Sequence, residues 1–114
     1  MVTSLEPLDH SVHLCPRFHA AVELIGKRWS GAILQLLLAG PERFFDLRKA
    51  IPEISDKMLS ERLKELEVHG LVVRRVIPDT PIRVQYSLSD KGQALGPSLR
   101  ELSQWAETWL EADV

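Results

Sequence analysis

The chain has little of several features, and each shortage excludes a class of protein. It has one cysteine in 114 residues, so no disulfide can form within the chain, and no cysteine cluster could hold a structural zinc ion. No apolar run approaches the length that crosses a bilayer, and no signal peptide opens the sequence. We therefore expect a cytoplasmic protein without a membrane partner.

The chain also lacks an excess of charge of either sign, since 14 basic and 16 acidic side chains leave a net charge of only −2. This balance does not by itself indicate a nucleic-acid binder. Residues 1–91 hold 13 basic and 12 acidic side chains, whereas residues 92–114 hold one and four. Any basic surface must therefore come from local arrangement within residues 1–91. With 45% apolar residues, the chain is long enough for one domain with a single core.

The segment from Ser55 to Gly70 is predicted to be an amphipathic helix. Ser55 is a good N-cap, and Leu59, Leu63 and Leu66 recur on one helical face. The polar side chains opposite these leucines are of the kind that a DNA recognition helix presents to a groove. The alternative is an ordinary helix whose polar face is simply solvated.

Three helices are predicted before this segment. The first spans residues 16–25, beginning at a proline whose missing amide costs nothing there. The second lies between Ser30 and Gly40, is apolar nearly all round and should be the central core helix. The third is short, covers residues 44–51 and ends before a proline. A short helix, a tight connection and a polar-faced helix make a helix-turn-helix.

Residues 71–77 and 82–88 predict an antiparallel hairpin. The first run is rich in valine and isoleucine, and the second alternates apolar and polar side chains. Residues 78–81 contain two prolines and form the tip. A helix-turn-helix followed by such a hairpin is a winged helix, so we expect an α+β, mostly α fold with a two-stranded wing.

A last helix is predicted over residues 90–111, with a kink or restart near Pro97. Its apolar residues recur at alternating spacings of four and three, which is typical of a helix that pairs with another helix. These residues are Leu95, Leu99, Leu102, Ala106 and Trp109. We divide the chain into a flexible arm, residues 1–14, and one domain, residues 15–112.

Several short motifs occur in a particular order between Cys15 and Leu110. They are Cys15-Pro16, Gly26-Lys27-Arg28-Trp29, Ile33-Leu34, Arg43-Phe44, Leu47-Arg48, Ile54-Ser55, Leu59 to Glu67, Gly70-Leu71-Val72, Pro81, Val84 to Leu88 and Lys91-Gly92, with Trp105 near the end. In order and spacing they resemble the HxlR family of bacterial winged-helix transcriptional regulators. The sequence departs from the family at Glu61, where many members carry glutamine, and at Gly31, so base preference is not carried over.

The resemblance implies a homodimer on double-stranded DNA with a two-fold-related operator. Each subunit would place its recognition helix in a major groove and its wing beside a minor groove. The ends of the chain would form the dimer interface, through the helices of residues 16–25 and 90–111. The expected interface residues are Phe18, Val22, Leu99, Leu102, Trp105, Ala106 and Trp109.

DNA contact is expected first from Ser55, Lys57, Ser60 and Lys64, because helix N-terminal amides and basic side chains favour phosphate. The remaining candidates are Met58, Glu61, Arg62, Arg83, Lys27 and Arg28. For Lys27 and Arg28, a solvated surface position is an equal alternative. Arg62 has two open roles: contact with a phosphate, or a stem laid on the core with its head paired to an acid.

Cys15 is a candidate for redox sensing. It lies at a helix N-terminus near Arg17 and His19, a setting that favours the reactive thiolate. The resemblance adds that some family members sense oxidants or electrophiles through a cysteine here. The alternative is a partly buried small residue with a packing role.

We therefore expect a homodimeric DNA-binding transcriptional regulator, a repressor, with a small-molecule effector left open. The alternative is a winged-helix protein-interaction module without specific DNA binding. The four histidines have no metal-ligand spacing, and there is no nucleophile with a base or glycine-rich phosphate loop. We expect no metal, no cofactor and no enzyme activity. Operator sequence, regulated genes and inducing signal are not predicted.

Overall fold

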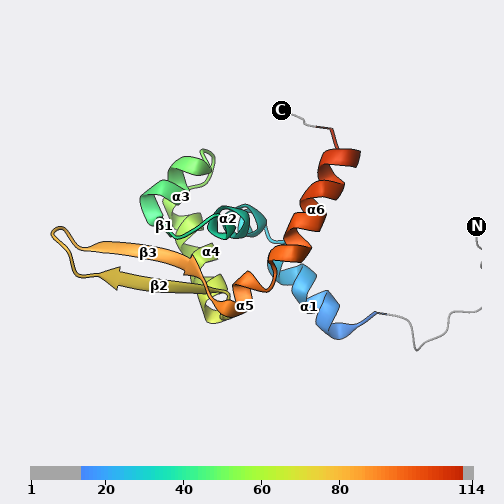
Figure 1. Ribbon diagram of the computed structural model, residues 1–114, viewed down its shortest axis with the longest axis horizontal. Coiled ribbons are helices and arrows are strands. Elements are labelled where there is room, and N and C mark those ends of the chain that lie inside the picture. The colour runs from blue at the N-terminus through green and yellow to red at the C-terminus, as the bar shows by residue number, and fades with distance from the viewer. Residues whose placement is uncertain (1–13, 112–114) are drawn as a thin grey trace, which may run out of the picture.

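The computed structural model describes residues 14–111, which form a winged helix with one helix before it and two after it (Figure 1). The elements are α1 (Pro16–Ile25), α2 (Ser30–Leu38), β1 (Glu42–Arg43), α3 (Phe44–Ala50), α4 (Asp56–Val68), β2 (Val72–Ile77), β3 (Arg83–Leu88), α5 (Asp90–Gln93) and α6 (Gly96–Trp109). The α+β, mostly helical fold is as predicted. Apart from Leu14, the predicted arm of residues 1–14 lies outside the described residues.

The core is built around α2, as its nearly all-apolar sequence predicts. Three of its apolar side chains are at most 1% exposed: Ile33, Leu34 and Leu37. The leucine stripe of α4 packs into the same cluster, since Leu59, Leu63 and Leu66 are also at most 1% exposed. Full burial of one such side chain contributes about 1.5–3 kcal/mol. The back of α4 is therefore firmly held.

Helices α3 and α4 form the helix-turn-helix. Ser55 caps α4, because its Oγ accepts a hydrogen bond from the amide of Met58 at 3.1 Å. Gly70 has φ +78°, the left-handed conformation that ends a helix most easily when the residue is glycine. The amide of Leu71 then donates to the carbonyl of Leu66 at 2.9 Å. Both predicted ends of the recognition helix are confirmed.

The sheet has three antiparallel strands in the order β1-β3-β2, one more than predicted. Strands β2 and β3 form the wing, paired from Val72↔Leu88 to Ile77↔Arg83. The additional strand β1 pairs Glu42 with Tyr86 and Arg43 with Gln85. A strand of two residues is too short for an alternating pattern to appear, so the sequence did not indicate it.

Helices α1 and α6 stand apart from the winged-helix body at one end of the molecule (Figure 1). The predicted restart near Pro97 is confirmed, because residues 90–111 divide into α5 and α6. Leu95 and Leu99 pack against the core, but the later part of α6 buries no side chain. No helix in residues 14–111 is both long enough and apolar enough to span a membrane.

Candidate nucleic-acid interface

The outer face of α4 carries the polar side chains that the sequence singled out. Lys57, Ser60, Glu61 and Lys64 are exposed, and they lie on the side opposite the buried leucines. Met58 is half-buried and packs against the core, so it offers less surface than its neighbours. A basic and hydroxyl-bearing surface is therefore available on a helix whose other side is fixed.

A groove of about 240 Å³ separates α4 from the wing. It is lined by Ser60, Lys64 and Glu67 of α4 and by Arg74 and Tyr86, which are register partners on β2 and β3. The sequence did not single out Tyr86 for binding, because its alternation pointed only to the core. The Arg74–Tyr86 pairing could be found only once the register of the hairpin was known.

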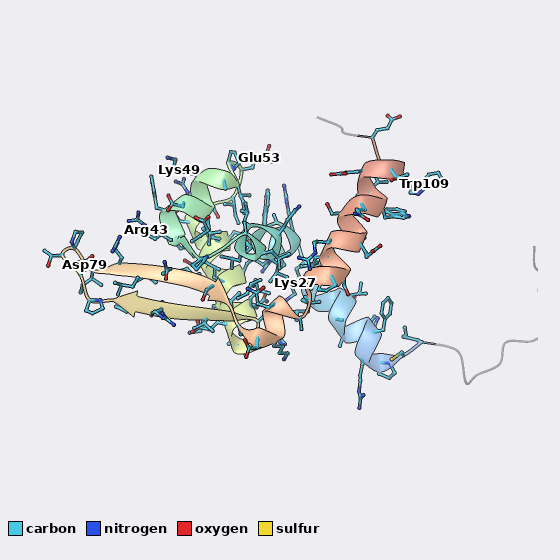
Figure 2. The ribbon with its side chains drawn as sticks, in the orientation of Figure 1. Lys27, Arg43, Lys49, Glu53, Asp79 and Trp109 are labelled. Carbon is cyan, nitrogen blue, oxygen red and sulfur yellow. The ribbon has the colours of Figure 1, made fainter. Side chains whose placement is uncertain are left out.

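The turn between α1 and α2 is attached to α4 through the side chain of Lys27 and the backbone carbonyl of Arg28. Lys27 Nζ lies 2.6 Å from Glu65 Oε2, and this hydrogen bond is the main reason that the pKa of the Glu65 carboxyl lies below its usual value. The Arg28 guanidinium lies over the ring of Trp29, 4.5 Å from the ring centroid. Figure 2 shows Lys27 near the place where α1 and α6 join the body.

Arg62 belongs to the same attachment. Its Nε donates to the carbonyl of Arg28 at 2.9 Å, and its Nη1 lies 3.5 Å from Glu65 Oε1. The side chain is only 17% exposed. The sequence left two roles open for Arg62. In the structure its stem lies against the protein and its guanidinium is paired with an acidic residue, which is the second of these roles.

Arg83 is engaged at the tip of the wing. Its Nη2 lies 2.8 Å from Asp79 Oδ2, and Asp79 is at the outer end of the hairpin in Figure 2. The candidates from the sequence therefore divide into two groups. Those on the front of α4 are exposed except for Met58, whereas Lys27, Arg62 and Arg83 each have an acidic partner. Arg28 belongs to neither group, because its guanidinium lies over Trp29.

The expected interface helices expose large apolar side chains. On α1, Phe18 is 65% and Val22 43% exposed; on α6, Trp105 is 52% and Trp109 71% exposed. Trp109 points outward from the far end of α6 (Figure 2). Leu102 is also exposed, whereas Ala106 and Leu99 are half-buried. Apolar surface of this extent is typical of an interaction site.

Cys15 is exposed and is the N-cap residue of α1, but its side chain makes no capping hydrogen bond. Within one subunit, then, Cys15 is not partly buried as the packing interpretation assumed. Within residues 14–111, no group of three or more His, Cys, Asp or Glu side chains is placed to hold a metal ion.

The chain matches known proteins over most of its length. The family model of the HxlR-like helix-turn-helix covers residues 24–114. YvaP of Bacillus subtilis (strain 168), an uncharacterized HTH-type transcriptional regulator, is 52% identical over 98 residues, which are 86% of this chain and 91% of that protein. YodB of the same strain, also an HTH-type transcriptional regulator, is 47% identical, with 86% and 88% covered.

Solved structures agree with this relationship. The reduced form of YodB superposes with a TM-score of 0.78 at 46% identity, covering 89% of this chain and 99% of that one. The redox regulator HypR in its oxidized form has a TM-score of 0.79 at 34% identity, with 88% and 100% covered. A winged helix with a polar-faced α4, matched over most of its length by such proteins, belongs to the HxlR family of helix-turn-helix transcriptional regulators.

Proposed function

We propose that this regulator binds a two-fold-related DNA site as a homodimer and represses transcription there. The observation that carries the proposal is α4, whose leucines are buried while Lys57, Ser60 and Lys64 are exposed on the opposite face. Helix α4 would enter the major groove, and the wing would lie beside the adjacent minor groove. Ser55, Met58 and Glu61 complete the surface of α4 that approaches the bases.

The groove beside α4 extends this surface to the wing. Arg74 and Tyr86 line it together with Lys64, so a DNA phosphate lying there would meet a guanidinium, a hydroxyl and an ammonium group, which together outweigh the one carboxylate of the groove, that of Glu67. We assign Lys27, Arg28 and Arg62 to holding α4 in place, because their contacts are with the protein itself. Arg83 is a weaker candidate for a phosphate contact, because Asp79 offsets its charge.

The exposed apolar residues of α1 and α6 support the homodimer. Two tryptophans more than half exposed are costly to leave in water and are well suited to anchor an interface. A second copy presents the same surface, as a two-fold interface requires. The two recognition helices of the dimer should then bind half-sites whose centres lie about 34–36 Å apart or at a multiple of that distance.

Footprinting on the DNA upstream of the chain's own coding region tests this function. A DNA-binding repressor protects a two-fold-related site, with an affinity that falls steeply as salt rises, and lowers transcription from that promoter in vitro. The alternative, a module that binds only proteins, gives no specific footprint. The relatives YvaP and YodB are both named as HTH-type transcriptional regulators, which does not favour that alternative.

Cys15 supports a second element of the proposal, a response to oxidants or electrophiles. The thiol is exposed at the start of α1, and the relative YodB has been solved in reduced, diamide-treated and quinone-bound forms. In quinone addition, the Cys15 sulfur would bond to a ring carbon of the quinone. The S–H bond breaks, and its proton passes to a quinone oxygen, so that a hydroquinone thioether forms. An oxidant would instead take two electrons and two protons from two thiols as a disulfide forms.

Because each chain has one cysteine, disulfide formation is limited to two partners. The disulfide must join Cys15 to a small thiol or to Cys15 of the partner subunit, and the latter needs Cα atoms within about 7 Å. We expect a quinone or mild peroxide to weaken operator binding by the wild type and to leave Cys15→Ser unaffected. An equal response in both proteins would remove Cys15 as the sensor while leaving DNA binding itself in place.

A further inference from the structure

A cavity of about 550 Å³ lies between α1, the end of α4 and α5. Six of its lining residues are apolar: Ala20, Ala21, Leu24, Ile25, Leu71 and Leu95. The other three are Arg17, His69 and Lys91, and none of the nine is acidic. Its size falls within the range of about 300–1,000 Å³ that is common for small-molecule sites.

One wall of the cavity is a buried, hydrogen-bonded stretch of backbone, and the wall that faces it is lined by small side chains. Leu71 is 3% exposed, and its carbonyl accepts from the amide of Ser89 at 3.0 Å. Helix α5 comes close to this carbonyl only because residue 92 is glycine, since a Cβ there would collide with it. On the facing wall, Ala20 and Ala21 carry only a methyl group each. The cavity therefore results from small residues on α1 opposite a fixed backbone.

The polar groups of the cavity favour an anion. Lys91 Nζ donates to the carbonyl of His69 at 2.7 Å, and a neutral carbonyl leaves the ammonium charge uncompensated and two N–H groups free. Arg17 adds a planar guanidinium, which suits a carboxylate. Within residues 14–111, no ion pair joins either side chain to an acidic residue.

We propose that this cavity binds an amphipathic organic acid. The hydrocarbon part lies against the apolar wall formed by α1, Leu71 and Leu95, and the carboxylate meets Arg17 and Lys91. Charge-assisted hydrogen bonds hold the acid group, and removal of apolar surface from water holds the rest. The site would give this regulator a reversible ligand that needs no reaction with a thiol.

Most of the cavity-lining residues of α1 lie on a different side of the helix from the proposed dimer face; Ile25, at the end of the helix, is the exception. At about 100° per residue, the centre of the Ala20, Ala21 and Leu24 face is roughly a third of a turn from Phe18 and Val22. Ligand binding therefore requires neither the homodimer nor DNA. The inference can be tested on the free protein, and its failure would leave the proposed repressor function untouched.

Calorimetric titration with phenylbutyrate tests the proposal, since this acid has an aromatic body and no group that reacts with Cys15. We expect binding at millimolar concentrations or below, and about tenfold weaker binding of the neutral analogue phenylbutanol. Arg17→Gln and Lys91→Gln should each weaken binding of the acid severalfold. Ala21→Leu should weaken both compounds, because it fills the cavity.

Lys49→Gln is the matched control, since it removes one positive charge from α3, away from the cavity, and should leave the affinity unchanged. Circular dichroism checks that each variant is folded, which matters most for Lys91 because of its bond to His69. Absence of phenylbutyrate binding to the wild type overturns the proposal. Equal affinities for the acid and the alcohol, or equal losses in Lys49→Gln and Arg17→Gln, overturn the assignment of an anion site.

Discussion

Lys27 Nζ lies 2.6 Å from Glu65 Oε2, which joins the turn after α1 to the middle of α4 across 38 residues of sequence. The two side chains are 47% and 33% exposed, so the pair alone contributes only about 0.2–1 kcal/mol. Arg62 reinforces it by bonding to the Arg28 carbonyl and lying beside Glu65. The position of the recognition helix is thereby connected to α1, the helix that begins beside Cys15.

The first prediction concerns the pH dependence of this pair. The pKa of Glu65 is held below its usual value near 4.5, chiefly by the hydrogen bond from Lys27. Because the folded-state pKa is lowered, the stabilisation is complete above the unfolded-state pKa and is lost as pH falls through the folded-state pKa. We expect Glu65→Gln to lower the free energy of unfolding at neutral pH and to approach the wild type in acid.

Urea denaturation at several pH values measures this difference. In a Lys27→Met background, Glu65→Gln should have a smaller effect at neutral pH, because the partner that stabilises the carboxylate is gone. If the two substitutions add without coupling, the pair contributes nothing to stability, and the connection rests on Arg62 alone.

The second prediction separates positioning of α4 from direct contact with DNA. Arg62→Ala removes a half-buried stem and its hydrogen bond to the Arg28 carbonyl, so we expect a loss of about 1–2 kcal/mol in unfolding free energy. DNA affinity should fall with little change in its salt dependence. Arg62→Lys should restore stability only in part, since lysine cannot bond to both partners in the same geometry.

A different result is expected if Arg62 touches a phosphate. The slope of log affinity against log salt would then become shallower by roughly 0.9, and the stability would change little. Measuring both quantities on the same variants therefore distinguishes the two roles.

Interactions between residues close in sequence could be predicted, whereas those between distant residues could not. The caps of α4 at Ser55 and Gly70 are local, because each depends on residues within a few positions, and both were predicted. The attachment of Arg62 to Arg28 spans 34 residues. An amphipathic pattern placed Arg62 only at the edge of the leucine stripe, so two roles stayed open until the folded chain brought its partners together.

The cavity beside α1 was even less predictable from the sequence than the Arg62 attachment. Ala20 and Ala21 look like ordinary residues of an amphipathic helix, and nothing in their spacing indicates empty space opposite them. The space depends on the approach of α5 to Leu71, which in turn depends on Gly92. Such a site is a property of three elements in contact and is not visible in the pattern of any one of them.

The third prediction concerns the front of α4. Lys64 is exposed and lines the groove shared with the wing, so Lys64→Ala should weaken binding to all DNA sequences and flatten the salt dependence by roughly 0.9 per lost phosphate contact. Ser60→Ala should cost less affinity but change base preference, because a hydroxyl carries little charge and can read a base edge. Binding assays on an operator and on mutated operators measure both effects.

Arg100→Gln provides the charge control for Lys64→Ala. Arg100 is exposed on α6, outside the helix-turn-helix and the wing, and its loss should leave the salt dependence as in the wild type. If Arg100→Gln and Lys64→Ala flatten the slope equally, the effect comes from net charge and not from a contact at α4.

The last prediction concerns assembly. Trp105→Ser with Trp109→Ser removes two side chains that are more than half exposed, so the fold of one subunit should be retained, as judged by circular dichroism. We expect light scattering to give a dimer for the wild type and a monomer for this variant. Operator affinity should fall steeply, because a monomer can contact only one half-site at a time. Ile82→Ser, which removes an equally exposed apolar side chain beside the wing tip, should remain dimeric. A wild type that is monomeric at micromolar concentration, or a double variant that still forms the dimer, would contradict the assignment of this surface of α6 to the interface.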